Sequence, residues 1–409
     1  MATVRPFKAL RPSAEHAKQV SSVPYDVVRD AEVRAFVADN PNSFLRVTRA
    51  EGDFAEASEP PGDDVFARAK QNLDRLTAEG FYSTDERRAY YLYQLSKNGH
   101  SQTGLVGVCS LDEYEQGLIK KHESVRPDKV EDRTDHLLAV RAQTGLIFLA
   151  FRGSEVTADL FKKAVRAPAI YDFVCADDIR HRVWRVEDTA PWTEAFRYVP
   201  SLYIADGHHR IESALRARDE MRGENAGHNG NEAYNFVLAG MFPAEDLSIL
   251  PYNRLVKDLN RLSKDDFFSK IRKNFILVSD TLVKSPEHTG DISMYLGGDW
   301  YRMRLNPAKR ERLSRIDAID ASILQNYVLR PILGVDDPTT DERISFVGGK
   351  RGTSELERMV DAGEAKVAFS LYATSMDDLL SVSDSGETMP PKSTWFEPKL
   401  KDGLLVYQL

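Results

Sequence analysis

The sequence has 409 residues, 42% of them hydrophobic and 29% charged, which is the composition of an ordinary soluble protein with room for two or three domains. Its 55 basic and 63 acidic residues give a net charge of −8, which argues against the basic surface that general nucleic-acid binding needs. The longest apolar run, residues 146–151, is too short to span a bilayer, and residues 1–10 lack the apolar core of an export signal. We therefore expect a cytoplasmic protein that binds neither nucleic acid nor membranes.

The first fifty residues predict a helix followed by a strand. The helix is expected over residues 30–39 and should stop before Pro41, which cannot continue it. Residues 44–47 form a short apolar run and are predicted as a strand. Asp26 precedes the helix and is either part of the turn that leads into it or a functional carboxylate. We treat it as a candidate substrate contact.

The next segment predicts a helix and a β-hairpin. Residues 64–79 carry an apolar stripe at helical spacing. Two apolar runs, residues 89–95 and 105–108, flank Asn98-Gly99, a dipeptide that favours a tight turn between antiparallel strands. Packing within a sheet explains the tyrosines of the first run.

Titratable residues crowd together between Lys120 and Arg133. A helix is expected from about residue 128, and a solvated helix face with internal ion pairs is the simplest interpretation of such a charge run. Lys121, His122 and Glu123 lie outside that helical stripe. Several cations beside a carboxylate suit a phosphate group and its metal, since the cations offset the phosphate charge and Glu123 can hold Mg²⁺ or accept a proton.

The most informative stretch is Asp206-Gly207-His208-His209-Arg210. A buried strand over residues 201–205 precedes it, and a helix with apolar positions at Ile211, Ala214 and Leu215 follows it. Glycine at the junction accepts a positive φ, and the first amides of a helix attract anions. A helix-capping role for Asp206 with two surface histidines is the alternative.

Further strands and helices are predicted before and after this stretch in the sequence. Strands are expected at residues 146–151, 171–175, 181–186 and 236–242, with a helix at 158–165. A boundary is expected near residue 250, followed by a helix at 264–274, strands at 275–278 and around Gly297-Gly298, and a helix at 317–329. Gly349-Lys350 is followed by Arg351 where a phosphate-binding loop needs Ser or Thr, so that motif fails. Near the end, Lys392, Ser393 and Thr394 are candidate substrate or phosphate contacts.

Two resemblances to known families follow from these residues. Asp206-Gly207-His208-His209-Arg210 resembles the signature of free-serine kinases of the ParB/sulfiredoxin-like superfamily. Val23-Pro24-Tyr25-Asp26-Val27-Val28, Lys120-Lys121-His122-Glu123 and residues 389–396 resemble the family called domain of unknown function 1015 over nearly the whole chain. The resemblance implies an α+β (mixed α/β) fold, with a ParB/sulfiredoxin-like nucleotide-binding region at residues 1–250, inserted hairpin and helices at about 51–195, and an α+β region at 251–409.

The kinase resemblance implies phosphoryl transfer from ATP or ADP to the hydroxyl of a small metabolite, with L-serine as a candidate acceptor. Asp206 would be the catalytic carboxylate, with Glu123 as the alternative base and His122 stabilising the transition state. Mg²⁺ would be held by Glu123 and Asp206. The donor phosphates would be bound by the helix start and nearby cations: Gly207, His208, His209, Arg210, Lys121, Arg126 and Lys129. Asp26, Lys392, Ser393 and Thr394 would contact the acceptor.

Two other functions are considered. A ParB-like module that binds and hydrolyses a nucleotide would produce a conformational change rather than a product. The full ParB arrangement is disfavoured because the chain shows neither a helix-turn-helix signal nor a basic face. A sulfiredoxin-like activity requires a reactive thiol at the corner, whereas Cys109 and Cys175 lie elsewhere and are expected to be reduced core residues. The acceptor, the nucleotide base and the oligomeric state leave no mark in the sequence.

Overall fold

The computed structural model describes residues 2–55, 61–279 and 282–409, and these fold into two units. Unit 1 comprises residues 1–120, 125–247 and 398–409, and unit 2 comprises residues 121–124 and 248–397. This division differs from the expected boundary at residue 250 in two places. The last twelve residues belong to unit 1, and the short segment Lys121–Ser124 belongs to unit 2. The protein is of mixed α/β class, as the sequence predicted.

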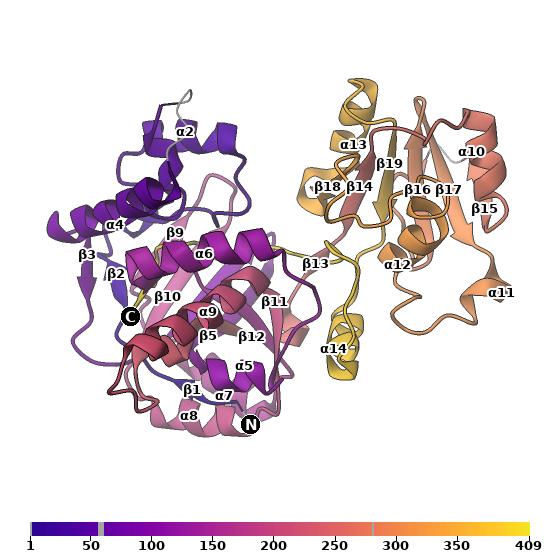
Figure 1. The fold of residues 1–409 in the computed structure, drawn as a ribbon. Helices are drawn as coiled ribbons and strands as arrows, with labels where there is room; N and C mark the ends of the chain where they lie inside the picture. The colour runs from indigo at the N-terminus through magenta and orange to yellow at the C-terminus, as the bar shows by residue number, and fades with distance from the viewer. Residues whose placement is uncertain (1, 56–60, 280–281) are drawn as a thin grey trace. The chain divides into compact units, whose positions relative to one another are not determined.

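Unit 1 is built on a nine-stranded mixed sheet (Figure 1). Strand β8 pairs in parallel with β12, and β11 with β6, while the other neighbours are antiparallel. Along the sheet the strands are β6 (Ile119–Lys120), β11 (Leu202–Asp206), β8 (Ile147–Phe151), β12 (Phe236–Pro243), β5 (His100–Ser110), β4 (Tyr90–Lys97), β10 (Arg180–Val186) and β9 (Tyr171–Val174), with β1 (Val4–Arg5) pairing with β5.

Helices cover one face of this sheet and enclose the main core. Leu92, Ile147 and Ile204 from alternate strand positions pack with Ile211 and Trp192 from the helices. Helices α6 and α9 run side by side across the sheet in Figure 1. The covering helices are α5 (Leu111–Glu115), α6 (Pro127–Val140), α7 (Glu155–Ala164), α8 (Ala190–Arg197) and α9 (His208–Glu224).

A second, smaller core lies in unit 1 around Phe44, Leu73 and Val406. In this core the N-terminal helices and the paired strands β2 and β3 pack against the last residues of the chain. The last strand, β21, pairs with β7. These elements are α1 (Ala17–Val20), α2 (Asp30–Asp39), α3 (Leu45–Thr48), α4 (Gly62–Ala78), β2 (Leu10–Pro12), β3 (Tyr82–Thr84), β7 (Ala142–Gln143) and β21 (Tyr407–Gln408).

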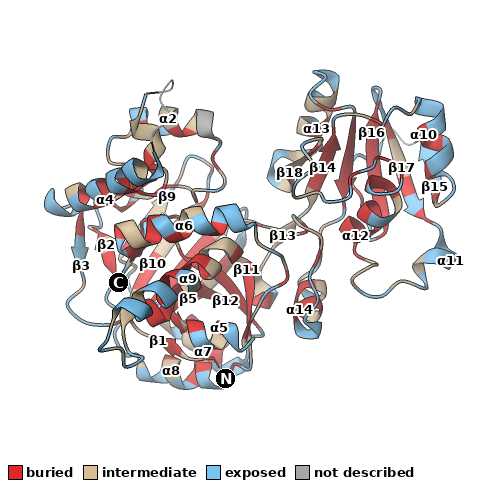
Figure 2. Ribbon diagram, viewed as in Figure 1, coloured by how far each residue is buried: buried red, intermediate tan, exposed pale blue. Residues whose placement is uncertain are grey.

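Unit 2 contains a six-stranded antiparallel sheet in which the central strands are buried throughout (Figure 2). The strand order is β15 (Phe275–Ser279), β17 (Asp299–Leu305), β16 (Asp291–Leu296), β19 (Val367–Leu371), β14 (Tyr252–Val256) and β18 (Ile344–Gly348). A small ladder joins β13 (Ile249–Leu250) to β20 (Trp395–Phe396). The helices are α10 (Lys264–Ile271), α11 (Pro307–Arg310), α12 (Asp320–Leu324), α13 (Gly352–Asp361) and α14 (Met376–Ser385).

The predicted elements are largely confirmed, with one reversal. The hairpin forms at Asn98 and Gly99, which both have positive φ (51° and 78°), as the two-residue turn requires. The strand predicted at residues 44–47 is wrong, because this run forms helix α3. Phe44 and Val47 are buried in the second core, and the backbone amides of residues 46–49 donate to carbonyl oxygens three or four residues earlier. An apolar run of four residues fits either structure.

The helix predicted at residues 317–329 begins later and changes form. It starts as α12 at Asp320 and continues as a π-helical turn at Gln325–Leu329. This segment is buried, and the Gln325 side-chain amide donates to the carbonyl oxygens of Val335 and Asp336. Tertiary packing therefore decides the local helical form.

Candidate functional site

The turn between β11 and α9 has the geometry that the sequence predicted. Gly207 adopts φ 100° and separates the last strand residue, Asp206, from the first helix residue, His208. A Cβ atom added to Gly207 would lie 3.0 Å from Nε of Arg210, so the guanidinium group packs closely over the glycine. The pairing of β11 with β8 shifts register between Ile204 and Asp206, which is a bulge-like irregularity that changes the direction of the final side chain.

Two cations hold the Asp206 carboxylate. Nη2 of Arg210 donates to Oδ2 at 2.8 Å, and Nζ of Lys399 donates to Oδ1 at 3.2 Å. Arg210 also donates to the carbonyl oxygen of Leu146 on the neighbouring segment. Lys399 comes from the final segment of the chain, so the corner is completed by a residue far away in sequence. Asp206 is therefore an oriented carboxylate at the start of a helix of 17 residues.

Three carboxylates surround the Arg210 guanidinium. Burial lowers the pKa of Arg210, but the negative charges of Asp206, Asp26 and Asp402 outweigh that effect and raise it above its usual value. Asp402 is buried, and its Oδ2 accepts a hydrogen bond from the backbone amide of Tyr25 at 3.2 Å. Sequence reasoning missed Asp402, since no local motif marks it.

The proton affinity of the Asp402 carboxyl group is raised. Burial and the charges of Asp26 and Asp206 raise its pKa to about 7, although Arg210 and the Tyr25 amide oppose the change. Close packing at Gly145 excludes a side chain there, because an added Cβ would lie 2.3 Å from Oδ1 of Asp402. Asp402 can therefore exchange a proton near neutral pH.

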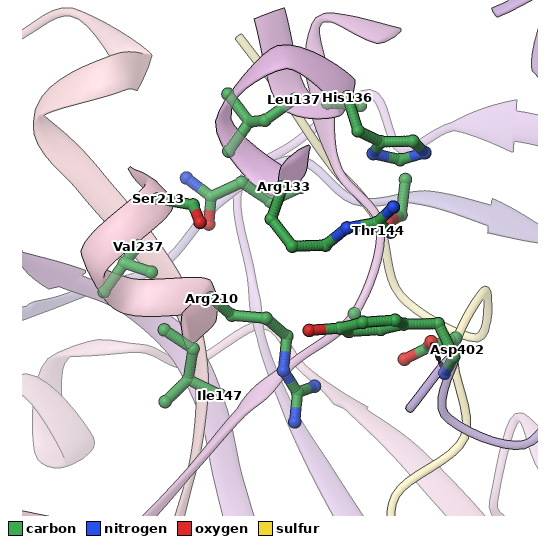
Figure 3. A pocket seen from close by; sticks show the side chains of 13 residues that line it. Arg133, His136, Leu137, Thr144, Ile147, Arg210, Ser213, Val237 and Asp402 are labelled. Carbon is green, nitrogen blue, oxygen red and sulfur yellow. Dashed lines mark hydrogen bonds between the residues drawn. The ribbon is translucent and has the colours of Figure 1, made fainter. Parts of the chain in front are cut away.

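A small pocket of about 50 Å³, partly open to solvent, lies beside this cluster (Figure 3). In the close-up, Arg133 extends from α6 and Arg210 from α9, and Asp402 approaches from the final segment. The guanidinium carbon of Arg133 lies 4.6 Å from the ring centre of Tyr25. Further lining residues include Thr144, Gly145 and Ser213. The pocket thus combines two cations, a carboxylate and hydroxyl groups.

One imidazole in the wall of this pocket is held neutral. Burial and the nearby charge of Arg133 lower the pKa of His136 to about 4. Its Nε2 lies 2.8 Å from the carbonyl oxygen of Val47, which can only accept, so the proton is on Nε2. His136 therefore contributes a donor to the structure and no positive charge to the pocket.

The two histidines of the corner differ in their surroundings. His208 is buried, whereas His209 is half-buried. The backbone N–H of Arg126 donates to Nε2 of His209 at 3.1 Å, which places the proton of the neutral ring on Nδ1. His209 thereby connects the start of α9 to the start of α6. The expected contacts of both rings with phosphate groups stay a prediction.

The remaining predicted residues of the charged segment lie at or near the start of α6 or in unit 2. Arg126 forms an exposed ion pair with Asp128, and Lys129 is exposed on α6. Lys121, His122 and Glu123 belong to unit 2, whereas Asp206 belongs to unit 1. The two expected Mg²⁺ ligands, Glu123 and Asp206, therefore lie in different units.

Unit 2 brings together two segments that were predicted separately. Nε2 of His122 and Oγ1 of Thr394 lie 3.2 Å apart, and the Lys392 backbone amide donates to Oε1 of Glu123 at 3.1 Å. Ser393 is buried and donates to the carbonyl oxygen of Pro390. Residues 122–123 and 392–394 thus form one cluster in unit 2.

Arg254 adds a cation to this cluster that the sequence did not reveal. Its side chain is buried in β14, and Nη2 donates to the carbonyl oxygen of Pro391 at 3.2 Å. Burial lowers the pKa of Arg254 to about 10, although the charges of Tyr252 and Glu123 oppose the change. A single arginine within an apolar strand gave no sequence signal of this contact.

No group of three or more His, Cys, Asp or Glu side chains in the described residues is placed to hold a metal ion. Magnesium in phosphoryl-transfer sites commonly uses one or two carboxylates together with phosphate oxygens. Throughout residues 2–55, 61–279 and 282–409, every helix falls short of the length and apolarity that a bilayer-crossing segment needs.

Comparison with known proteins gives one family and several distant structures. A family model described as a protein of unknown function (DUF1015) matches residues 4–322, and the chain matches no curated protein. SbnI with a C-terminal truncation, from Staphylococcus aureus, is 12% identical, with a TM-score of 0.41 over 74% of this chain and 87% of that chain. A free serine kinase in complex with AMP is 11% identical, with a TM-score of 0.36 over 71% and 86%. A conserved hypothetical protein from Pyrococcus furiosus is 10% identical, with a TM-score of 0.37 over 73% and 93%.

Proposed function

The chain belongs to the DUF1015 family of proteins of unknown function, and we propose that it is a nucleotide-dependent phosphotransferase acting on the hydroxyl group of a small metabolite. The observation that carries this proposal is the β11–α9 corner. There, a glycine at φ 100° brings the start of a 17-residue helix next to a carboxylate held by two cations. The helix start favours phosphate oxygens, since its first amides have no carbonyl partner within the helix.

In this proposal the donor phosphates of ATP or ADP bind at residues 207–210. The amides of the first turn and the His209 ring would contact phosphate oxygens. Arg210 would act mainly as a positioning residue, because its Nη2 already donates to Asp206 and its Nη1 to Leu146. The positive end of the helix dipole adds to the attraction for negative charge.

The carboxylates would handle the acceptor hydroxyl. Asp206 would orient the hydroxyl for in-line attack, as its own position is fixed by Arg210 and Lys399. Asp402 lines the adjacent pocket, and its raised pKa of about 7 suits the acceptance of a proton at neutral pH. Asp26 would contact the acceptor at the same cluster, because its charge already acts on Arg210 and Asp402.

Mg²⁺ would be held by Asp206 together with phosphate oxygens, and when bound it would neutralise charge that develops on the transferred group. The substrate and phosphate contacts expected of six residues in unit 2 stay predictions: Lys121, His122, Glu123, Lys392, Ser393 and Thr394. The acceptor would be a small hydroxyl compound such as L-serine, which offers a carboxylate and an ammonium group for recognition.

The direct test is the Asp206→Asn variant. Phosphoryl transfer should fall at least about a thousandfold, since the variant loses the negative charge that orients the hydroxyl, while calorimetry should show that ATP or ADP still binds. Transfer can be followed by phosphorus NMR with pooled amino acids and sugars as acceptors. Asp172→Asn is the matched control, because Asp172 is also paired with an arginine, Arg180, but this ion pair is exposed.

Wild-type transfer by Asp206→Asn would contradict the catalytic role of this carboxylate. Nucleotide hydrolysis that no acceptor accelerates would instead favour the switch module considered above, in which nucleotide binding changes conformation. Wild-type protein that binds no nucleoside diphosphate or triphosphate in the presence of Mg²⁺ would refute both functions.

A further inference from the structure

A second pocket in unit 1 shares no lining residue with the pocket beside Asp402. Its cavity volume is about 380 Å³, which is within the range of small-molecule sites, and it is partly open to solvent. It lies where β1 and the segment after it approach the last strand, β21, and the loop before β12. Its lining residues are Arg5, Pro6, Phe7, Lys8, Thr84, Arg88, Val108, Asn231, Ala233, Phe236, Tyr407 and Gln408.

Three cations line this pocket, and none of its lining residues is acidic. Within the described part of the chain, no carboxylate forms an ion pair with Arg5, Lys8 or Arg88. The backbone pairing of Phe7 with Ala89 brings Lys8 and Arg88 to neighbouring positions on two segments. Like charges so placed repel one another, and a bound anion would relieve that repulsion. The whole chain, in contrast to this pocket, has a net charge of −8.

Arg5 is oriented for a planar ligand. Its guanidinium carbon lies 4.4 Å from the ring centre of Phe236, and Nη1 donates to Oδ1 of Asn231 at 3.4 Å. The guanidinium group thus lies over the phenyl ring, and Arg5 is only partly buried. The opposite face can stack against an aromatic ring of a ligand.

Tyr407 adds a hydroxyl group close to the cations. Burial raises the pKa of Tyr407 to about 12, while the charges of Arg88 and Arg5 oppose the change, so both guanidinium groups lie near the phenol. Its ring packs edge-on against Phe7, with centres 5.7 Å apart. The neutral hydroxyl is a donor available to an anion in this pocket.

We propose that this pocket binds a small aromatic phosphate, with the phosphate on Arg88 and Lys8 and the ring stacked on the Arg5 guanidinium. Arginines bind phosphate through paired donors, and the aromatic lining supplies the apolar part of the site. This site is independent of the proposed phosphotransfer, because it uses none of the residues of the β11–α9 corner.

The test is calorimetry on the full chain with phenyl phosphate as the probe. Wild-type protein should bind it, and Arg5→Ala and Arg88→Ala should each weaken binding by at least about tenfold, the effect of losing the stacking contact or one charge-assisted contact. Arg87→Ala is the matched control. It removes the same charge at the position next to Arg88, and the Arg87 side chain does not line the pocket. Lys8→Ala removes an exposed side chain and should weaken binding without loss of packing.

Thermal unfolding of each variant shows whether the fold is retained. If Arg5→Ala unfolds, the affinity of Lys8→Ala for phenyl phosphate still tests the proposal. Equal binding by Lys8→Ala, Arg88→Ala and wild type would overturn the proposal, as would equal weakening in Arg87→Ala. Glycerol 3-phosphate should bind more weakly than phenyl phosphate, and equal affinity would refute the stacking. Loss of phenyl phosphate binding in Arg133→Ala would place the ligand in the pocket beside Asp402 and also overturn the proposal.

Discussion

At the residue scale, the candidate site is an arginine surrounded by carboxylates. Asp206, Gly207 and Arg210 were predicted from one short motif, whose glycine has the positive φ that the sequence implied. Asp402 and Lys399 were not assigned to the site, because they meet Asp206 and Arg210 only through the return of the chain. Contacts over such a sequence separation leave no periodic or motif signal, so a single sequence cannot reveal them.

The raised pKa of Asp402 predicts a change of stability with pH. The folded protein binds the proton more tightly than the unfolded chain, in which the pKa is near 3.8. Asp402 therefore contributes stability that is fully present below about pH 4 and is lost as the pH rises through about 7. The loss is about 4 kcal/mol at most, since one pKa unit corresponds to about 1.4 kcal/mol.

Asp402→Asn should remove this dependence. Relative to wild type, its free energy of unfolding should rise between pH 5 and pH 8, because the variant has no carboxyl group to ionise at that position. Urea denaturation across this range measures the difference, and other groups that titrate in both proteins cancel. Asp172→Asn should show no such trend, as ion pairing with Arg180 lowers the pKa of Asp172. A parallel pH profile for Asp402→Asn and wild type would contradict the assignment.

At the element scale, the ends of helices and strands were predicted well where a turn-forming or helix-ending dipeptide marks them. Asn98-Gly99 fixed the hairpin of β4 and β5, and Asn40-Pro41 ended α2 where expected. The run at residues 44–47 was assigned wrongly as a strand because four apolar residues satisfy either period, and burial against α4 selects the helix. The π-helical turn after α12 has no local signature.

The β11–α9 junction predicts that Gly207→Ala impairs nucleotide binding. A left-handed conformation costs a residue with a side chain about 1–2 kcal/mol, and the added Cβ would crowd Arg210 at 3.0 Å. Displacement of Arg210 removes one of the two cations that hold the Asp206 carboxylate. Denaturation should show lower stability, and calorimetry with ATP or ADP should show weaker binding.

Gly80→Ala separates backbone strain from crowding in this experiment. Gly80 has φ 81°, and an added Cβ there would have no atom within 4 Å. The control should lose stability through the backbone alone and keep wild-type affinity for nucleotide. If Gly207→Ala binds nucleotide as Gly80→Ala does, the junction is not a phosphate site.

At the scale of the whole molecule, the last twelve residues are part of unit 1 although unit 2 precedes them in sequence. Leu404, Leu405 and Val406 are fully buried, and β21 pairs with β7. The mixed α/β class and most elements could be predicted, whereas the exchange of short segments between units could not. Composition changes little at residues 121 or 398, so no boundary is visible there.

Leu405→Ala should therefore weaken unit 1 and the site together. Removal of a buried leucine side chain costs about 2–5 kcal/mol, and the same segment carries Lys399 and Asp402. Chemical denaturation should show the loss, and phosphoryl transfer should fall with it. Leu282→Ala is the control, because Leu282 is 90% exposed and its truncation should change stability by less than about 0.5 kcal/mol. Unchanged stability of Leu405→Ala would contradict the role of this segment.

The ion pair between Asp206 and Lys399 also bears on how quickly the corner can form. Its partners are 193 residues apart in sequence, and all of residues 248–397 lie between them. Closing so long a loop carries a larger entropic cost than forming the local Asp206–Arg210 pair. During refolding, the Arg210 contact should thus appear early and the Lys399 contact late, so the carboxylate acquires its second cation only in a slow final phase.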